Sequence, residues 1–203
     1  CLDELKLTDS VREEIEIIYK KTTYIGQLIS QLLTISRTDK HSFKPQKEEV
    51  DLTLLIESVI EELQQKAAYK NISLLFEYIP QNESYIIQGD TMLLMRMIYN
   101  LIENAIKYNK DEGWVRVSLN ADHKYFYVTV TDSGLGIPEE SIDHIFERFY
   151  RVDKSHSAEI EGTGLGLAIT RSAIMMHHGA IRVKSQVGEG TTFSVRIPLT
   201  FID

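Results

Sequence analysis

Cysteine is almost absent from this 203-residue chain, since Cys1 is the only one. A single cysteine excludes an internal disulfide framework and a zinc site built from several thiolates, and it suits a reducing compartment. Long apolar runs are lacking as well, because none approaches the roughly 18–20 residues that span a bilayer, and no signal peptide opens the chain. Any attachment to a membrane is therefore expected only through segments upstream of Cys1.

An excess of positive charge is also missing. Lys and Arg number 22 against 30 Asp and Glu, which gives a net charge of −8. Sequence-independent binding to nucleic acid or anionic lipid is therefore not expected, and a phosphate site has to be built from local groups. The 43% hydrophobic and 26% charged content is ordinary for a soluble globular protein, with room for one full domain and a smaller appendage.

Residues 10–39 predict one long helix. An apolar residue recurs every seven positions, at Val11, Ile18, Ile25 and Leu32, and Ser10 with a glutamate three residues later resembles a capping box. The stripe would extend over about 45 Å at 1.5 Å per residue. It could pack on its own domain, but a coiled-coil or bundle seam with a partner helix is favoured. The opening letters CLDELK are typical of the middle of a helix, so we expect the chain to be a fragment.

A polar stretch with Pro45, residues 38–47, ends this helix, and the pattern then becomes mixed α and β. Asp90 is the expected N-cap of one of the helices, and Gly179 is the expected left-handed residue that closes another. The predicted helices cover residues 52–69, 91–109, 139–149 and 165–178. The predicted strands cover residues 72–78, 84–88, 114–119, 125–131, 181–185 and 192–198.

The first candidate site lies in the helical segment NLIENAIKY. Asn100, Asn104, Lys107 and Tyr108 fall within about 100° of arc and give the helix one polar face. An amide oxygen is a hard, neutral ligand for Mg²⁺, which takes few protein ligands beside phosphate oxygens, and Lys107 could neutralise phosphate charge. The alternative for these residues alone is a solvated helix face.

A second candidate, DSGLGIP, directly follows a predicted strand. Asp132 would stand at the strand end, in a turn that Gly134 and Gly136 make possible. A carboxylate there accepts hydrogen bonds only, so it would match the exocyclic amine of adenine and repel the oxygen that guanine carries at that position. Taken alone, the motif is also common turn chemistry.

GTGLGL, residues 162–167, opens a predicted helix. Its glycines let a ligand approach the backbone, and the helix N-terminus supplies free N–H groups and a positive dipole. No Lys-Ser/Thr follows as in a P-loop, and a long polar loop rather than a strand precedes it.

Between these motifs lies FERFYR, residues 146–151. Aromatic side chains in a polar loop need somewhere to be buried. They indicate either a hinged lid, from about residue 138 to residue 164, or a small satellite core.

Taken in order, N-x-x-x-N-A-x-K-Y, D-x-G-x-G-I-P, F-x-x-F and G-x-G-x-G-L resemble the N, G1, F and G2 boxes of two-component sensor histidine kinases. The closing GEGTTF is similar to the terminal hairpin of the same catalytic domain, so the resemblance covers about residues 47–199. It implies a two-layer α/β sandwich of the α+β class, shared with gyrase, heat-shock-chaperone and mismatch-repair ATPases. A mixed sheet would be covered by helices on one face, with a long helix of a helical-hairpin dimerisation domain in front.

The resemblance also implies ATP and Mg²⁺ as cofactors. Asn104 would hold the metal and Asp132 the adenine, while Tyr108 would line the base pocket. The residues expected in catalysis are Asn100, Lys107, Arg148 and Arg151. The nucleotide is expected to contact, besides Asn104, Tyr108 and Asp132, the residues Gly134, Gly136, Ile137, Phe149, Gly162, Thr163, Gly164, Leu165, Gly166, Leu167 and Thr192.

The chain departs from the family at one point, because none of its six histidines has the H-E-x-x-x-P context of the phosphate acceptor. His177 and His178 end a helix, where compensation of the helix dipole is the expected role. We therefore expect residues 1–43 to be partial dimerisation helices without the acceptor, and residues 44–203 to be the ATP-binding domain. The acceptor histidine is expected upstream of Cys1.

The implied function is transfer of the ATP γ-phosphate to a histidine and then to an aspartate of a response-regulator receiver domain. The full-length protein is expected to be a homodimer through the N-terminal helices, with this part in the cytoplasm of a membrane-anchored bacterial sensor. One alternative is an ATP-hydrolysing switch, but those ATPases carry a glutamate four residues before the metal-binding asparagine, where this chain has Asn100. A degenerate binding module is disfavoured by the intact boxes.

Overall fold

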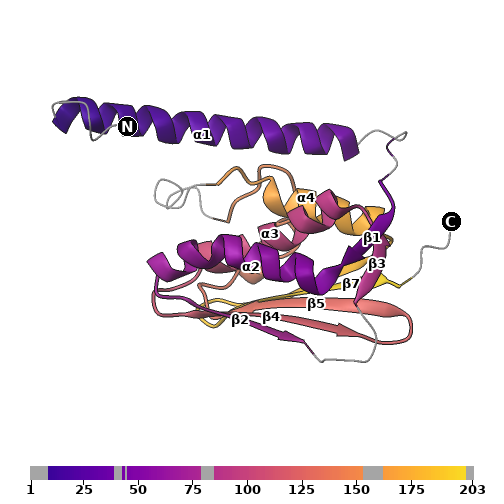
Figure 1. Cartoon of the computed structure of the whole chain (residues 1–203). Coiled ribbons are helices and arrows are strands. Elements are labelled where there is room, and N and C mark those ends of the chain that lie inside the picture. Colours follow the sequence, from indigo (N-terminus) through magenta and orange to yellow (C-terminus); the bar gives the residue numbers. More distant parts are fainter. Residues whose placement is uncertain (1–8, 39–42, 44, 79–84, 153–161, 200–203) are drawn as a thin grey trace. The chain divides into compact units, whose positions relative to one another are not determined.

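The computed structural model describes residues 9–38, 43, 45–78, 85–152 and 162–199. The chain divides into two compact units, Cys1–His41 and Ser42–Asp203. The first contains helix α1 (Asp9–Thr38), which confirms the long predicted helix (Figure 1). The side chain of Ser10, the expected cap, lies outside the described part. Among the described residues no helix combines the length and apolarity needed to cross a membrane.

Two helices of the second unit begin at aspartate caps. Asp51 accepts hydrogen bonds from the first turn of α2 (Leu52–Tyr69), and Asp90 accepts one from Leu93 N at 3.1 Å in α3 (Thr91–Lys107). Such caps satisfy N–H groups that have no partner within the helix. The Asp90 cap is confirmed, whereas Asp51 was not foreseen. The aspartate ends β1 (Glu48–Asp51), a short polar strand that pairs with β3 (Ile86–Gly89) and that its sequence did not predict.

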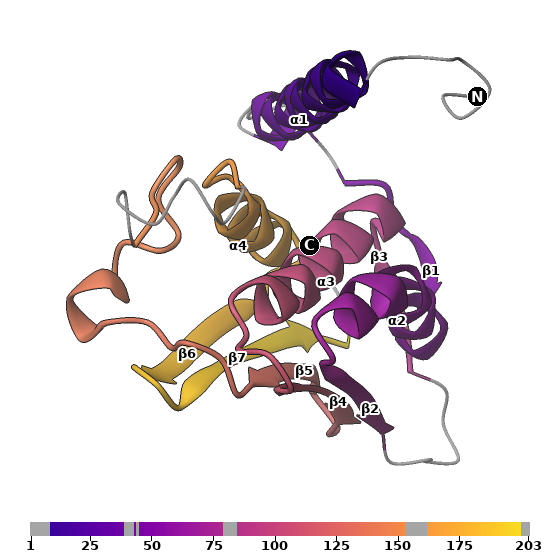
Figure 2. The same ribbon diagram turned by 90° about the vertical axis from the view of Figure 1, so that its left-hand side faces the viewer.

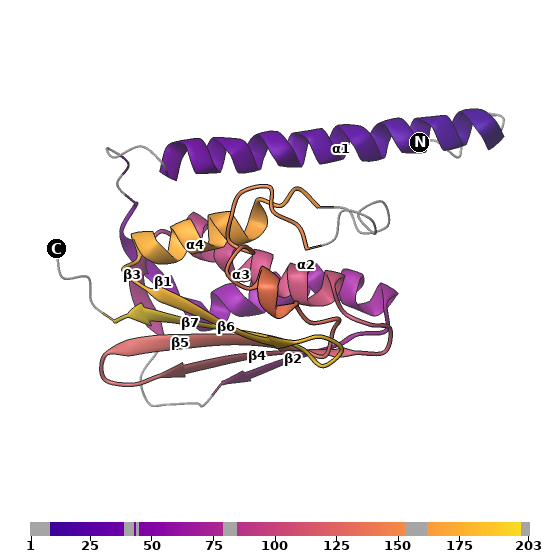
Figure 3. The ribbon, with the colours of Figure 1, turned by 180° about the vertical axis from the view of Figure 1, so that it is seen from behind.

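A five-stranded sheet forms the other layer of this unit. Across the sheet the strands are β2 (Ser73–Tyr78), β4 (Trp114–Ala121), β5 (Tyr125–Asp132), β7 (Gly190–Pro198) and β6 (Ala180–Gln186). Within this sheet β2 and β4 pair in parallel, and the other neighbouring strands pair antiparallel. Helices α2, α3 and α4 (Gly166–Met176) cover one face of the sheet, as Figures 2 and 3 show from two sides. The predicted mixed sheet with helices on one face is therefore confirmed.

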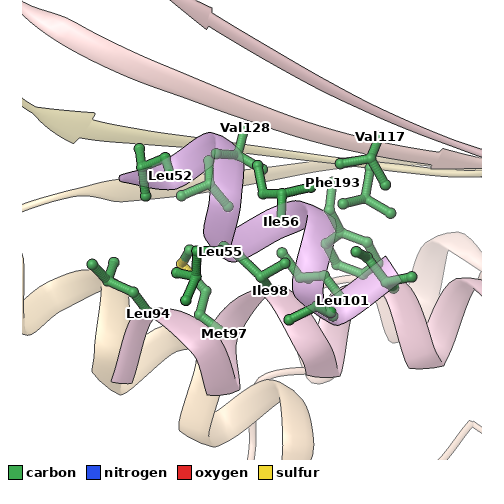
Figure 4. Packing of buried hydrophobic residues seen from close by; sticks show 14 of the residues in the cluster. Leu52, Leu55, Ile56, Leu94, Met97, Ile98, Leu101, Val117, Val128 and Phe193 are labelled. Atoms are coloured by element: carbon green, nitrogen blue, oxygen red, sulfur yellow. The ribbon is translucent and has the colours of Figure 1, made fainter. Parts of the chain in front are cut away.

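The core lies between these helices and the sheet, and strand alternation explains it. In β5 every second side chain is buried, at Phe126, Val128 and Val130, while the residues between them are half exposed. Apolar residues of α2 and α3 pack onto this face, among them Ile56 and Leu101 (Figure 4). The other face of the sheet carries mostly polar side chains.

Two helix predictions were partly wrong. The expected helix at 139–149 is reduced to one 3₁₀ turn, η2 (Glu139–Ser141), because the backbone bonds that follow run mostly to the residue three positions back and form separate turns. The stretch ends at Phe149, which has a φ of 64° and donates its N–H to Gly164 O at 2.9 Å. At the end of α4 the left-handed residue is His178, with a φ of 54°, not Gly179. Gly179 is needed for space, since a Cβ there would lie 2.5 Å from Arg196 O.

Candidate functional site

Three motifs that lie far apart in the sequence meet at the C-terminal end of α3. Leu135 N donates to Tyr108 O at 3.0 Å, which fastens the DSGLGIP turn to that end. On the other side, a Cβ at Gly162 would collide with Lys107 Nζ. A Cβ at Gly134 would likewise collide with Tyr108 O. Glycine at position 134 therefore allows the turn to approach the helix end closely, whereas at position 162 the flexible end of the Lys107 side chain could move aside.

Asp132 stands at the end of β5 with only 8% of its surface exposed. Its Oδ1 accepts from Gly134 N at 2.8 Å and from Thr191 N at 3.2 Å. Among the described residues none donates to Oδ2, and no fully buried side-chain oxygen there lacks a partner, so Oδ2 opens to the surface. Burial raises the pKa of this carboxyl, and the two N–H groups oppose the rise. One oxygen thus orients the carboxylate, and the other is available to a donor.

The polar face of α3 lies next to this carboxylate. Asn104 is half buried, and its side chain makes no hydrogen bond within the described residues. Lys107 Nζ lies 5.0 Å from the centre of the Tyr108 ring. Burial raises the pKa of the Tyr108 phenol, and the nearby Arg151 guanidinium opposes that rise. An amide, an ammonium, a guanidinium and an aromatic ring are therefore gathered at one helix end.

Asn100 has a different environment from Asn104. It is buried, and its Nδ2 donates to Gly166 O at 2.9 Å and to Thr170 Oγ1 at 3.4 Å. These bonds join α3 to the first turn of α4. The Nδ2 group of Asn100 therefore links the two helices, while its Oδ1 accepts no hydrogen bond from the described residues, and the expected catalytic role of Asn100 stays a prediction.

The GTGLGL loop turns at Gly164, which has a φ of 70°. Thr163 Oγ1 accepts from Leu165 N at 3.2 Å. Leu165 is fully buried and Leu167 packs against the core, so their side chains point away from a ligand and only their backbone can serve one. Gly166 is the first residue of α4, whose N-terminus has the free N–H groups and dipole that favour an anion.

A hydroxyl network supports the other side of Asp132. Gly136, with a φ of 71°, packs so tightly on Gln186 that a Cβ would overlap its carbonyl. The next residue, Ile137, donates its N–H to Ser185 Oγ at 2.8 Å. Ser185 Oγ also lies 2.8 Å from the hydroxyl of Thr191, whose N–H reaches Asp132. The turn, β6 and β7 are thereby joined behind the carboxylate.

The structure does not bring Thr192 to this cluster. Its Oγ1 donates to Thr131 Oγ1 at 3.2 Å on the sheet face opposite the helices. The buried neighbour Thr191 lies beside Asp132 instead, because successive strand residues point to opposite faces. Thr192, which was expected to contact the nucleotide, is therefore not on the face of the sheet that carries Asp132. The sequence contained this information. Phe193 is a core residue, and the side chain two positions before it, Thr191, lies on the same face of the strand.

The aromatic loop contains both kinds of residue that were expected of it. Phe146 packs edge-on against Phe193, with ring centres 6.5 Å apart, and Tyr150 also packs on the core. Phe149 is 61% exposed, as a side chain of a lid would be. Arg148 is exposed, and Arg151 donates to Gly162 O at 3.1 Å. Residues 153–161 of the expected lid lie outside the described residues, so the lid stays a prediction.

The side chains of this cluster could hold a metal ion only together with a bound ligand. Among the described residues no group of three or more His, Cys, Asp or Glu side chains could hold an ion. The whole amide group of Asn104 is without a hydrogen bond among the described residues, and Mg²⁺ commonly takes one or two protein ligands together with phosphate oxygens and water. A site for Mg²⁺ would therefore depend on a bound polyphosphate.

The expected role of His177 was wrong. It is completely buried, its Nε2 lies 3.0 Å from Asp90 N, and its Nδ1 lies 2.7 Å from Ala173 O. Accepting from a backbone N–H requires a neutral ring protonated on Nδ1. Burial also lowers the pKa of His177. A neutral ring cannot compensate a helix dipole with charge, so His177 instead links the end of α4 to the start of α3.

The fold and these side chains together define a class of protein. It is an α/β sandwich in which the buried carboxylate of Asp132, the N-terminus of α4 and two cationic side chains surround the C-terminal end of α3. The family described as "Histidine kinase-, DNA gyrase B-, and HSP90-like ATPase" matches residues 89–201. The match covers more than half of the chain, which therefore belongs to this family.

Known relatives agree with this assignment. The circadian input-output histidine kinase CikA of Synechococcus elongatus is 33% identical over 95% of this chain and 26% of its own length. The heme sensor protein HssS of Staphylococcus saprophyticus is 35% identical over 98% of this chain and 43% of its own length. The chain thus spans less than half of these relatives.

Solved structures give the same result for the fold. The catalytic domain of the histidine kinase ThkA aligns with a TM-score of 0.66 and 31% identity, over 76% of this chain and 99% of that domain. ThkA in complex with the response regulator protein TrrA aligns with a TM-score of 0.74 and 25% identity, over 97% of this chain and 54% of that one. The resemblance to two-component sensor histidine kinases is confirmed.

Proposed function

We propose that this chain is the ATP-binding catalytic region of a two-component sensor histidine kinase. It would bind Mg·ATP and transfer the γ-phosphate to a histidine on a dimerisation helix, from which an aspartate of a response regulator takes it. The observation that carries the proposal is Asp132, a buried carboxylate with one oxygen held by two backbone N–H groups and the other without a donor among the described residues.

The roles of the site residues follow from their positions. Oδ2 of Asp132 would accept from the exocyclic amine of adenine, with the half-exposed ring of Tyr108 against the base. The phosphates would lie toward Lys107, Arg151 and the N-terminus of α4, where positive charge and free N–H groups favour anions. Asn104 would hold Mg²⁺, which neutralises phosphate charge when bound.

In the transfer, the bond between the γ-phosphorus and the β,γ-bridging oxygen breaks while a bond to the attacking histidine nitrogen forms. ADP leaves with the bridging oxygen and its electron pair. Stabilising the charge on the transferred group and positioning it supply most of the catalysis in such reactions. Lys107 and Arg151 are the cations of this chain placed for that task, and the exposed Arg148 is near enough in sequence to assist from the loop.

A hydrolysing switch is the competing function, and the surroundings of two residues oppose it. Activation of water needs a base near the metal. Asn100 donates its amide to Gly166 and Thr170 and has no basic atom there. Glu103 is paired with Lys66 on α2, and Tyr99 also donates to it, so its carboxylate is engaged away from the site.

Helix α1 supports an oligomeric protein. The heptad residues Ile18, Ile25 and Leu32 are between 45% and 63% exposed in the described structure. Apolar seams of this length are normally buried by partner helices. We propose that residues 1–43 belong to the dimerisation domain and residues 44–203 to the ATP-binding domain. We propose also that the full protein is a homodimer anchored to a bacterial membrane through other segments, with this part in the cytoplasm.

The proposed metal ligand gives a direct test. Titration calorimetry should show Mg²⁺-dependent binding of ATP to the wild-type chain, and Asn104→Ala should lose most of the metal dependence because its amide oxygen is removed. Gln65→Ala, on the exposed face of α2, is the matched control and should bind as the wild type does. Unchanged affinity and metal dependence in Asn104→Ala would contradict the assignment.

A further inference from the structure

Ser185 on β6 has no role in the function proposed so far, yet its hydroxyl makes three contacts behind the base pocket. Ile137 N donates to it at 2.8 Å, Gly190 O lies 2.9 Å away, and Thr191 Oγ1 lies 2.8 Å away. Ser185 and Thr191 are directly paired across β6 and β7. The contacts connect the DSGLGIP turn with the strand that holds Asp132 through its N–H.

The protons in this network can be assigned by counting. A serine hydroxyl has one proton to donate and two lone pairs that accept. Ile137 N–H occupies one lone pair, and the carbonyl of Gly190 can only accept, so it takes the serine proton. The remaining lone pair of Ser185 must then accept from the Thr191 hydroxyl. The proton of Thr191 is therefore directed to Ser185.

This assignment determines what the pocket offers to a base. Thr191 is 6% exposed and lies beside Asp132. With its proton committed to Ser185, its oxygen presents only lone pairs, as the carboxylate of Asp132 does. Adenine carries a donor at its exocyclic position, whereas guanine carries an acceptor there. If the Thr191 hydroxyl could turn, it could donate to that guanine oxygen.

We infer that Ser185 is a positioning residue that sets purine selectivity by holding the Thr191 hydroxyl as an acceptor. The inference rests on the proposed binding of ATP next to Asp132, and it concerns a residue that does not itself contact the nucleotide. A hydroxyl that cannot reorient leaves the oxygen of guanine opposite lone pairs only, and an unpaired buried polar group is a strong basis for rejection.

The experiment measures the ratio of ATP to GTP affinity by calorimetry. Ser185→Ala frees the Thr191 proton, so the ratio should fall by about tenfold, mainly because GTP binds better. Ser185→Thr restores a hydroxyl and should keep the wild-type ratio. Ser185→Cys keeps the shape but hydrogen bonds weakly, should shift the ratio in the same direction, and keeps the test open if the alanine variant is unstable. Ser194→Ala removes a hydroxyl from the exposed face of β7 and is the matched control.

The same measurement in a protein that also carries Thr191→Val separates the two explanations. If Ser185 acts through the Thr191 proton, Ser185→Ala should leave the ratio unchanged when Thr191 has no hydroxyl. An equal loss of ATP and GTP affinity in folded Ser185→Ala would show a merely structural serine and overturn the inference. The same shift with and without the Thr191 hydroxyl would also overturn it. Failure of the wild-type chain to bind ATP would instead contradict the proposed function, and this inference with it.

Discussion

At the scale of single residues, the site depends on which atoms already have partners. Asp132 and Asn100 are equally buried, each at 8% exposure. Asn100 uses its amide nitrogen to bond a carbonyl and a hydroxyl of another helix, whereas Asp132 is a charged acceptor held through one oxygen by two backbone N–H groups. Sequence spacing alone could not separate these two cases, because it shows which residues share a face but not which atoms are already bonded.

The Asp132 carboxylate should control the choice of base. Asp132→Asn keeps the shape but replaces an acceptor by a donor and removes the charge. Loss of a charged hydrogen bond costs about 1.5–3 kcal/mol, so ATP affinity should fall roughly 10- to 150-fold, and the ATP/GTP affinity ratio should fall as well. Calorimetry measures both, with Glu61→Gln on the exposed side of α2 as a control for charge. Unchanged values for Asp132→Asn would place the adenine elsewhere.

His177 should make stability depend on pH. Its folded pKa lies below the ordinary 6.5 because burial disfavours the charged ring. Below pH 6.5 the unfolded chain therefore binds a proton that the folded chain does not, and stability falls as the pH falls. Between pH 7.5 and 5.5 this contribution reaches up to about 1.4 kcal/mol.

Urea unfolding of the wild type and of His177→Gln at the two pH values measures this contribution. The variant should be less stable at pH 7.5, because the Asp90 N–H and Ala173 O lose well-placed partners, but its stability should depend less on pH. His123→Gln, an exposed histidine in the β4–β5 turn, should retain the wild-type pH dependence. If His177→Gln also keeps the full dependence, other groups cause it.

At the scale of elements, the packing of α3 against α4 determines the site. Asn100 bonds to Gly166 O and Thr170 Oγ1 at the start of α4, and His177 bonds to Asp90 N at the start of α3. Helix α4 is thus fastened near both of its ends to α3, at the start and in the middle of α3. The N-terminus of α4 and the polar face of α3 are thereby held at a fixed separation, which a polyphosphate binding between them requires.

Asn100→Ala tests this coupling. The buried Thr170 hydroxyl and the Gly166 carbonyl would lose their donor, so we expect the free energy of unfolding to fall by about 1–3 kcal/mol, together with weaker binding of ATP. Urea titration and calorimetry measure the two effects, and Asn120→Ala at the exposed end of β4 serves as control. Wild-type stability and ATP affinity combined with abolished phosphate transfer would mean that Asn100 acts in the chemistry.

At the scale of the whole molecule, the sequence predicted the long elements well. Periodicity identified α1, α2, α3 and the strands of the large sheet, because each carries its apolar residues at a regular spacing. It failed where tertiary contacts decide the backbone. The polar strand β1 forms by pairing with β3, and the helix expected at 139–149 is replaced by turns that end where Phe149 bonds to Gly164.

The site was predicted to a similar extent. The ordered boxes correctly brought together the end of α3, the DSGLGIP turn and the GTGLGL loop, since glycine spacing reflects close backbone approach. Thr192 was not brought to the cluster, and Ser185 was not among the expected residues, because a hydroxyl that bonds across two strands leaves no pattern in either strand. The neutral state of His177 could not be foreseen either, since it depends on Asp90, which lies 87 residues away.

The last prediction concerns the whole 203-residue chain. Incubated with Mg·ATP, it should acquire no acid-labile phosphate, because none of its six histidines has the H-E-x-x-x-P context of an acceptor and His177 is buried with both ring nitrogens bonded. Given in trans a helix that carries such an acceptor box, the chain should phosphorylate that histidine. Transfer should be slower than within one protein, since tethering supplies an effective concentration on the order of millimolar.

Lys107→Gln should reduce transfer strongly, whereas Lys20→Gln on α1 should not. Efficient steady-state hydrolysis of ATP by the chain alone, abolished by Asn104→Ala, would assign the protein to the hydrolysing branch of its family.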